Sequence, residues 1–172
     1  MHYRVRCGKA WGEQRLNKSK LPALDPTLAL VILRIVLGAL FVSTFFENLG
    51  KGLYSAEGYA GLIRSYIKYG HAPIVWKQVM EFNAAHAAIV APLQAVLEVG
   101  VGVALILGFL SRPAAFVAFG FLTGLWVSEW GLGWIWELLV PMVVAAALTL
   151  GPSGQRAALD VALTRRWPQL PI

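Results

Sequence analysis

The stretch AIVAPLQAVLEVGVGVALILGFL, residues 88–110, decides the fold that this sequence predicts. It is apolar over a length sufficient to cross a bilayer, which takes about 20 residues, yet it carries Glu98 near its middle. A carboxylate inside a membrane is costly unless a neighbouring group compensates it. Gln94, Glu98 and Gly102 recur at helical spacing and share one face, so we expect that face to contact protein and not lipid.

Arg34 is the predicted partner of Glu98, because it is the basic residue inside the first apolar run, residues 27–49. Pairing would offset the cost of both charges, and Gln94 belongs to the same buried polar group. Two alternatives stay open: Asp160 competes for Arg34, and the long arginine side chain can extend to the membrane surface. A buried pair can also fix how helices pack without taking part in chemistry.

The composition is typical of a membrane protein, since 58% of the 172 residues are hydrophobic and only 14% are charged. The formal net charge of +6 does not predict nucleic-acid binding, because the basic residues are not interleaved with aromatic residues. The one cysteine, Cys7, stands without a CxxC or HExxH motif. The sequence therefore predicts no internal disulfide and no metal or haem centre.

Four apolar runs predict an all-α integral membrane protein, a four-helix bundle with an amphipathic helical cap between the first and second helices. The predicted spans are residues 27–49, 88–110, 113–130 and 134–150, and the cap is residues 50–87. Together they form one transmembrane domain, residues 27–151, between basic tails at 1–26 and 152–172.

The segment between the first two spans is too polar to cross a membrane and too apolar to be a linker. Tyr59, Ile63 and Tyr66 fall on one helical face, with Arg64 off it. This pattern predicts an amphipathic helix that lies at the membrane surface. Pro73 suits the first turn of a second short helix, which we expect to cap the bundle.

The basic residues are distributed unevenly between the two predicted sides of the bundle. Most lie in the two tails and in the turn at Arg112, and fewer lie in the cap, at Lys51, Arg64, Lys68 and Lys77. Because cytoplasmic segments of membrane proteins are enriched in lysine and arginine, both termini are expected to be cytoplasmic. The predicted location is the inner (plasma) membrane of a bacterial-type cell, which the chain crosses several times.

Several short motifs resemble those of the DoxX/DoxD family. They are Leu33-Arg34 with Gly38 and Phe41, the passage GKGLYSAEGYAGLI at 50–63, Glu98-x-Gly100-x-Gly102 before Leu107-Gly108, Ser111-Arg112, and Gly151 with Leu159-Asp160. Members of that family are four-helix membrane proteins, among them the small subunit of thiosulfate:quinone oxidoreductase. The resemblance therefore implies a quinone-linked oxidoreductase subunit that acts with a partner protein, with quinone as its cofactor.

Polar residues from all four predicted helix ends are expected to converge at the outer edge of the bundle, beside tryptophans. Carboxylates near a low-dielectric edge raise one another's proton affinity, and histidine titrates close to neutral pH. We therefore expect Glu137, Glu47 and His86 to exchange the protons of a quinone, as the catalytic residues. The residues expected to bind the quinone are Trp130, Trp134, Trp136, Asn48, Lys51 and Glu129. The alternative is an anchor without chemistry, since carboxylates and tryptophans are common where membrane proteins meet water.

Two function classes stay open from the sequence. The first is the quinone-linked subunit, which needs a protein partner to supply electrons. The second is a noncatalytic membrane scaffold that recruits or stabilises a redox enzyme through the outer cap. In either class the expected partners are the lipid bilayer and a protein subunit, with a homo-oligomer as a further alternative and no nucleic acid. A transporter is less well supported, because the sequence shows no internal repeat or broken helix.

Overall fold

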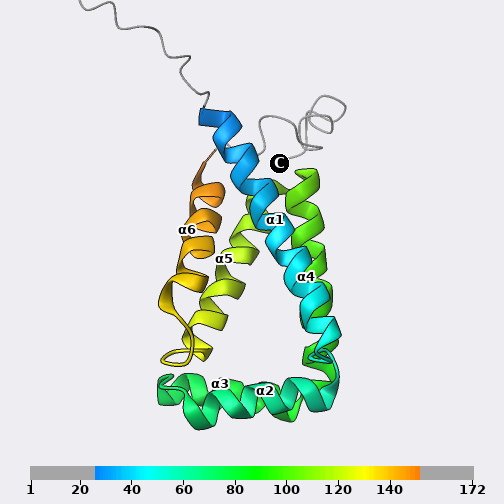
Figure 1. Cartoon of the computed structure of the whole chain (residues 1–172), viewed down its shortest axis with the longest axis vertical. Helices are drawn as coiled ribbons and strands as arrows, with labels where there is room; N and C mark the ends of the chain where they lie inside the picture. The colour runs from blue at the N-terminus through cyan, green and yellow to red at the C-terminus, as the bar shows by residue number, and fades with distance from the viewer. Residues whose placement is uncertain (1–25, 152–172) are drawn as a thin grey trace, which may run out of the picture.

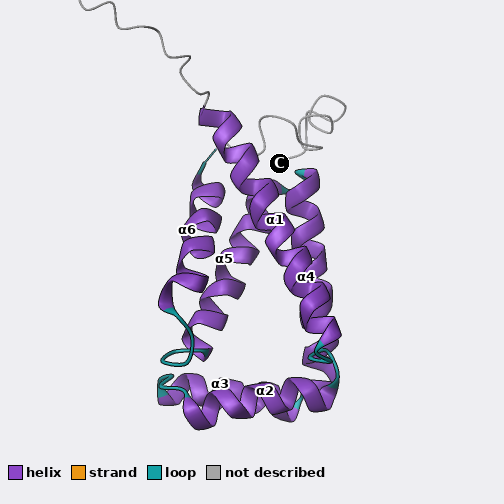
Figure 2. Cartoon of the chain, in the orientation of Figure 1, coloured by secondary structure: helices purple, strands orange, loops and turns teal. Residues whose placement is uncertain are grey.

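The computed structural model describes residues 26–151, and this part of the chain is helical, with turns but no strand (Figure 1, Figure 2). Its helices are α1 (Pro26–Gly50), α2 (Ala56–Tyr69), α3 (Ile74–Ala85), α4 (Ala87–Leu107), α5 (Ser111–Ser128) and α6 (Ile135–Leu150). The predicted all-α class is confirmed. Asp160 and nearly all of the two predicted tails lie outside the described residues.

Two pairs of long helices form the upright part of the structure, and a layer of two shorter helices lies across one end. Figure 1 shows α1 beside α4 and α5 beside α6, with α2 and α3 crossing below them. The two helices of each pair run in opposite directions (Figure 1). We call α2 and α3 together the transverse layer, and it falls within the segment predicted as the cap.

Two of the four predicted spans, α1 and α4, are long and apolar enough to cross a membrane. The mean hydropathy is 2.4 over Thr27–Gly50 and 2.1 over Ala87–Leu107. α6 is apolar but has 16 residues, and α5 is not among the helices that meet both requirements, because Ser111 and Arg112 lower its hydropathy. The bundle of four spans stays a prediction.

Glycines allow α1 and α4 to approach each other closely. A Cβ atom on Gly38 would lie 2.7 Å from the carbonyl oxygen of Gly102. One on Gly102 would lie 2.8 Å from the Val42 side chain. Both distances are too short for a carbon contact, so only glycine fits at either position without moving a helix. Small residues of this kind are typical of tightly packed membrane helices.

The buried apolar residues form two clusters. One lies between the upright helices, and the other lies within the transverse layer and between it and the start of α4. The first cluster includes Leu37, Phe41, Leu105, Leu122 and Leu148, and the second includes Tyr59, Ile63, Met80, Ala84 and Ala91. The second cluster packs the apolar face of α2 against α3 and the first half of α4. The predicted amphipathic helix is therefore present as α2, with its apolar face covered by protein, and its place at the membrane surface stays a prediction.

Large apolar side chains also cover the outward faces of the upright helices. Val36 on α1 is 58% exposed, Leu93 on α4 is 63% exposed, and Val143 on α6 is 62% exposed. Soluble proteins rarely leave extended apolar surfaces of this size uncovered. Contact with lipid explains these exposed apolar faces more simply than contact with water does.

Candidate functional site

Glu98 is the most deeply buried carboxylate in the described part of the chain, at 1% exposure, and its hydrogen-bond donors lie on three segments. Gln94 Nε2 donates to Oε1 at 2.8 Å, and Asn48 Nδ2 donates to Oε2 at 3.2 Å. The Tyr54 hydroxyl donates to the same Oε2. Both carboxylate oxygens therefore accept hydrogen bonds, which offsets part of the cost of burying the charge.

Each donor reaches Glu98 for a simple reason of geometry. Gln94 precedes Glu98 by one turn of α4, so both lie on one face. Asn48 lies in the last turn of α1, and Tyr54 lies in the turn that follows, with its ring 5.4 Å from that of Phe45. Glu98 thus lies at the level where α1 ends. Burial, followed by the hydrogen bond to Glu98, raises the pKa of Tyr54 above its usual range, so this phenol keeps its proton.

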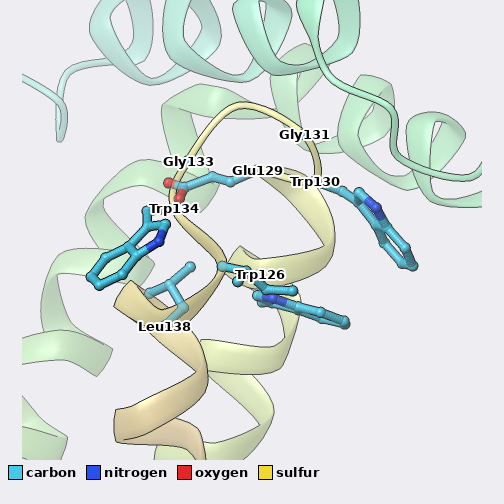
Figure 3. A pocket seen from close by; sticks show the side chains of 8 residues that line it. Trp126, Glu129, Trp130, Gly131, Gly133, Trp134 and Leu138 are labelled. Atoms are coloured by element: carbon cyan, nitrogen blue, oxygen red, sulfur yellow. The ribbon is translucent and has the colours of Figure 1, made fainter.

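A second site lies at the connection between α5 and α6. A partly open hollow of about 260 Å³ is present there. Figure 3 shows the Glu129 carboxylate directed toward Trp134, with the ring of Trp126 below and the Trp130 ring turned aside. The lining residues are Trp126, Glu129, Trp130, Gly131, Gly133, Trp134, Ile135 and Leu138. The wall is therefore mainly aromatic and aliphatic, with one carboxylate.

Glu129 is held from the opposite side by α2. The Tyr66 hydroxyl donates to Glu129 Oε1 at 2.6 Å, while Oε2 faces Gly133 on the side of the hollow, 3.5 Å from where a Cβ on that glycine would lie. Burial, then the hydrogen bond and charge of Glu129, and then the charge of Glu137 raise the pKa of Tyr66. Glu129 therefore has one oxygen engaged by a protonated phenol and one oxygen turned toward the hollow.

The transverse layer also fixes the loop that forms the hollow. Trp76 Nε1 donates to Ser128 Oγ at 2.9 Å, and the backbone N–H of His71 donates to the Trp130 carbonyl at 2.7 Å. Gly131 has a φ of +86°, and a Cβ there would lie 2.3 Å from His71 Nδ1. Glycine is thus required at this position both by the left-handed backbone and by the histidine ring.

A family model described as DoxX matches residues 29–129. The chain belongs to the DoxX family. Comparison with curated proteins and comparison with solved structures each give no match. The match covers Glu98 and its three donors and ends at Glu129, so both carboxylates lie within the matched residues. The family match and the two long apolar helices together indicate a membrane protein of the DoxX type.

This DoxX protein does not bring Arg34 and Glu98 together, although it buries both. Arg34 is 0% exposed and lies in the buried stripe of α1 with Val31 and Leu37. Asn48, which reaches Glu98, follows Arg34 by almost four helical turns, or about 20 Å along α1. The described partners of Glu98 are amides and a phenol, while Gln94 lies beside it as the sequence suggests.

The predicted outer constellation is divided between two corners of the DoxX structure. Figure 1 places the α1–α2 turn and the α3–α4 junction at one corner and the α5–α6 loop at the other. Between them runs α2, whose 14 residues correspond to about 20 Å. The first corner holds Glu47, Asn48, Lys51 and His86, and the second holds Glu129, Glu137, Trp130, Trp134 and Trp136. The interpretation as a single cluster is therefore wrong, because the transverse layer separates its halves.

Several of these residues lie away from both sites. Glu47 and Lys51 form an exposed ion pair at 2.5 Å. His86 is exposed, with Nδ1 2.8 Å from the carbonyl oxygen of Phe82. Glu137 and Trp136 are exposed and do not line the hollow. Within residues 26–151, no group of three or more histidine, cysteine or acidic side chains is arranged to hold a metal ion.

The residues of these sites that the sequence analysis does not assign to a site include Tyr54, Tyr66 and Trp126. Tyr54 lies in the passage that resembles the family, and Tyr66 was assigned only to an apolar face. Tyrosines that recur along an amphipathic segment next to a span are the signal that could have indicated Tyr54 and Tyr66, because a tyrosine hydroxyl can reach a carboxylate at a helix end.

Proposed function

We propose that this DoxX protein is the membrane subunit of a quinone-linked oxidoreductase and that it binds the quinone head group in the hollow between α5 and α6. One observation carries the proposal: an aromatic hollow whose one carboxylate, Glu129, is hydrogen-bonded to Tyr66. Ligand sites commonly combine apolar walls with a few convergent polar groups. A quinone ring needs flat apolar walls, and its carbonyl oxygens need donors.

The chemistry requires two electrons and two protons for each quinone reduced to quinol. In this proposal a partner subunit supplies the electrons as it oxidises its own substrate, which by family resemblance is thiosulfate or a related sulfur compound. Glu129 takes up one proton from water and passes it to a quinone oxygen. The second proton reaches the other quinone oxygen from water at the open side of the hollow. Tyr66 keeps its proton and orients Glu129 through Oε1.

Quinone titration tests this binding site. The protein is purified with and without co-purifying subunits, and quinone is added while tryptophan fluorescence is recorded. We expect saturable quenching by the wild type and weaker binding by Trp134→Ala, because Trp134 lines the hollow. The matched control is Trp136→Ala, an exposed tryptophan two residues away and outside the lining. Equal affinity in all three proteins would contradict this site.

The alternative is a noncatalytic scaffold that recruits or stabilises a redox enzyme. One observation favours it: α2 exposes a charged stripe formed by Glu57, Arg64 and Lys68, which recur at helical spacing. An acidic surface of a partner protein could bind to the two basic residues of this stripe. Reversing charge with Arg64→Glu and Lys68→Glu should then release the partner and leave quinone binding unchanged. A partner that stays bound to this variant would contradict a scaffold role for the stripe.

A further inference from the structure

The two helices of the transverse layer expose chemically different faces. On α2 the exposed stripe is the charged one described above, Glu57, Arg64 and Lys68. On α3 the exposed residues are mainly apolar, with Gln78 and Glu81 as the polar ones: Ile74 is 78% exposed, Val75 is 69% exposed and Phe82 is 62% exposed. The two faces therefore suit different environments.

Contacts on its other side fix the orientation of α3. Trp76 Nε1 donates a hydrogen bond to Ser128 Oγ at 2.9 Å. Lys77 Nζ donates to the carbonyl oxygens of Ile67 and Gly70 at 2.9 and 3.1 Å, so the one basic side chain of α3 is turned inward onto the end of α2. The helix cannot rotate its apolar face inward without breaking these bonds.

The exposed face of α3 continues into the lipid-facing side of α4. At their junction the ring centroids of Phe82 and His86 lie 4.2 Å apart. Beyond it, Ile89, Leu93 and Val96 are 69%, 63% and 66% exposed, and their spacing places them on one face of α4. Since α4 is apolar enough to span a membrane, an apolar surface extends from this span along α3.

We infer that α3 lies in the interface of the bilayer, with Ile74, Val75 and Phe82 among the lipid chains and the charged stripe of α2 facing water. Burying these side chains in lipid removes apolar surface from water, which is the main force holding amphipathic helices at membranes. The occupant of this face is lipid, because the surface is continuous with a membrane span. The inference goes beyond quinone binding and does not depend on it.

Single-cysteine labelling of the full chain tests this placement. In a Cys7→Ser background, Ile74→Cys and Phe82→Cys place an environment-sensitive dye on α3, and Glu57→Cys and Arg64→Cys are the matched controls on α2. All four positions are exposed, so the substitutions should leave the fold intact. The labelled proteins are reconstituted in phosphatidylcholine vesicles. Each is exposed in turn to iodide in water and to a nitroxide attached to the lipid near its head group.

We expect dyes at residues 74 and 82 to show blue-shifted emission, strong quenching by the lipid nitroxide and several-fold weaker quenching by iodide than dyes at residues 57 and 64. Iodide quenching at 74 and 82 equal to that at the α2 positions would overturn the inference, because the face would then lie in water. Protection of 74 and 82 from both quenchers would also overturn it, because protein and not lipid would cover the face.

Discussion

At the residue scale, the Glu98 carboxylate connects three segments that are distant in sequence: the end of α1, the turn after it and the middle of α4. Its donors are Asn48, Tyr54 and Gln94. Removing the acceptor leaves three partly buried donors without this partner, and each unsatisfied group costs free energy. The role of Glu98 in stability therefore depends on hydrogen bonding more than on pairing with a cation.

We predict that Glu98→Leu lowers the free energy of unfolding by about 3 kcal/mol or more, because three donors lose their acceptor. Glu98→Gln should cost less, about 1–3 kcal/mol, because the amide oxygen still accepts a hydrogen bond. The measurement is denaturant unfolding of the protein in detergent, followed by circular dichroism. Equal losses for the two variants would show that the charge, and not the hydrogen bonds, determines stability.

Two half-buried tyrosines, Tyr54 and Tyr66, predict a stability change in alkaline solution. The pKa values of Tyr54 and Tyr66 are raised in the folded protein above the value of 10.0 that applies to a free phenol. The folded state then holds these protons more tightly than the unfolded state, so their contribution is fully present below pH 10 and is lost as pH rises above it. The melting temperature should fall above pH 10, and less steeply in Tyr54→Phe with Tyr66→Phe.

The control for this pH prediction is Tyr69→Phe, because Tyr69 is exposed. Its melting curve should show the same alkaline fall as the wild type. If the double variant and the wild type have parallel profiles between pH 8 and about pH 11, the buried phenols make no contribution in this range.

At the element scale, the contact between α1 and α4 depends on a glycine in each helix. Gly102→Ala should lower the melting temperature and the free energy of unfolding by about 1–3 kcal/mol, because the added methyl group collides with Val42. Gly100→Ala is the matched control two residues away, where a Cβ meets nothing within 4 Å. That variant should be neutral or slightly more stable. A loss at Gly100→Ala as large as at Gly102→Ala would argue against this packing.

The sequence was sufficient to predict the apolar helices and the pairing of Gln94 with Glu98, because both depend on spacing within one helix. It was not sufficient to predict that Asn48 and Tyr54 reach Glu98. That contact depends on where α1 ends relative to α4, which the glycine contact sets. The position of α1 relative to α4 also decides the fate of the expected pair of Arg34 and Glu98. Arg34 lies almost four helical turns along α1 from the residue that reaches Glu98.

For the second site, the sequence suggested that tryptophans and glutamates gather at one edge, but not which of them meet. The length of α2 separates the two corners, and no local pattern indicates that this helix lies across the bundle. Glu129 lines the hollow while Glu137, in the first turn of α6, is exposed. The difference depends on the turn at Gly131, whose close contact with His71 is a tertiary feature.

At the scale of the whole molecule, the arrangement of the spans predicts an orientation. Reporter fusions at residues 20 and 165 should both give a cytoplasmic signal, and a fusion near Tyr69 should report the opposite side, since most basic residues lie in the tails. The assay is a paired phosphatase and fluorescent-protein fusion at each position. A periplasmic signal from either terminus would reverse the orientation.

We propose that the Glu129 carboxylate in the α5–α6 hollow transfers protons to a quinone, and turnover of the assembled complex is the measurement that checks this role. Glu129→Gln keeps the shape and a hydrogen bond with Tyr66 but removes the carboxylate, whereas Glu137→Gln removes an exposed carboxylate outside the hollow. At equal assembly, Glu129→Gln should lower quinone-dependent turnover by about 100-fold or more and change its pH profile. Glu137→Gln should behave as the wild type. Wild-type turnover and pH dependence in Glu129→Gln would contradict the account.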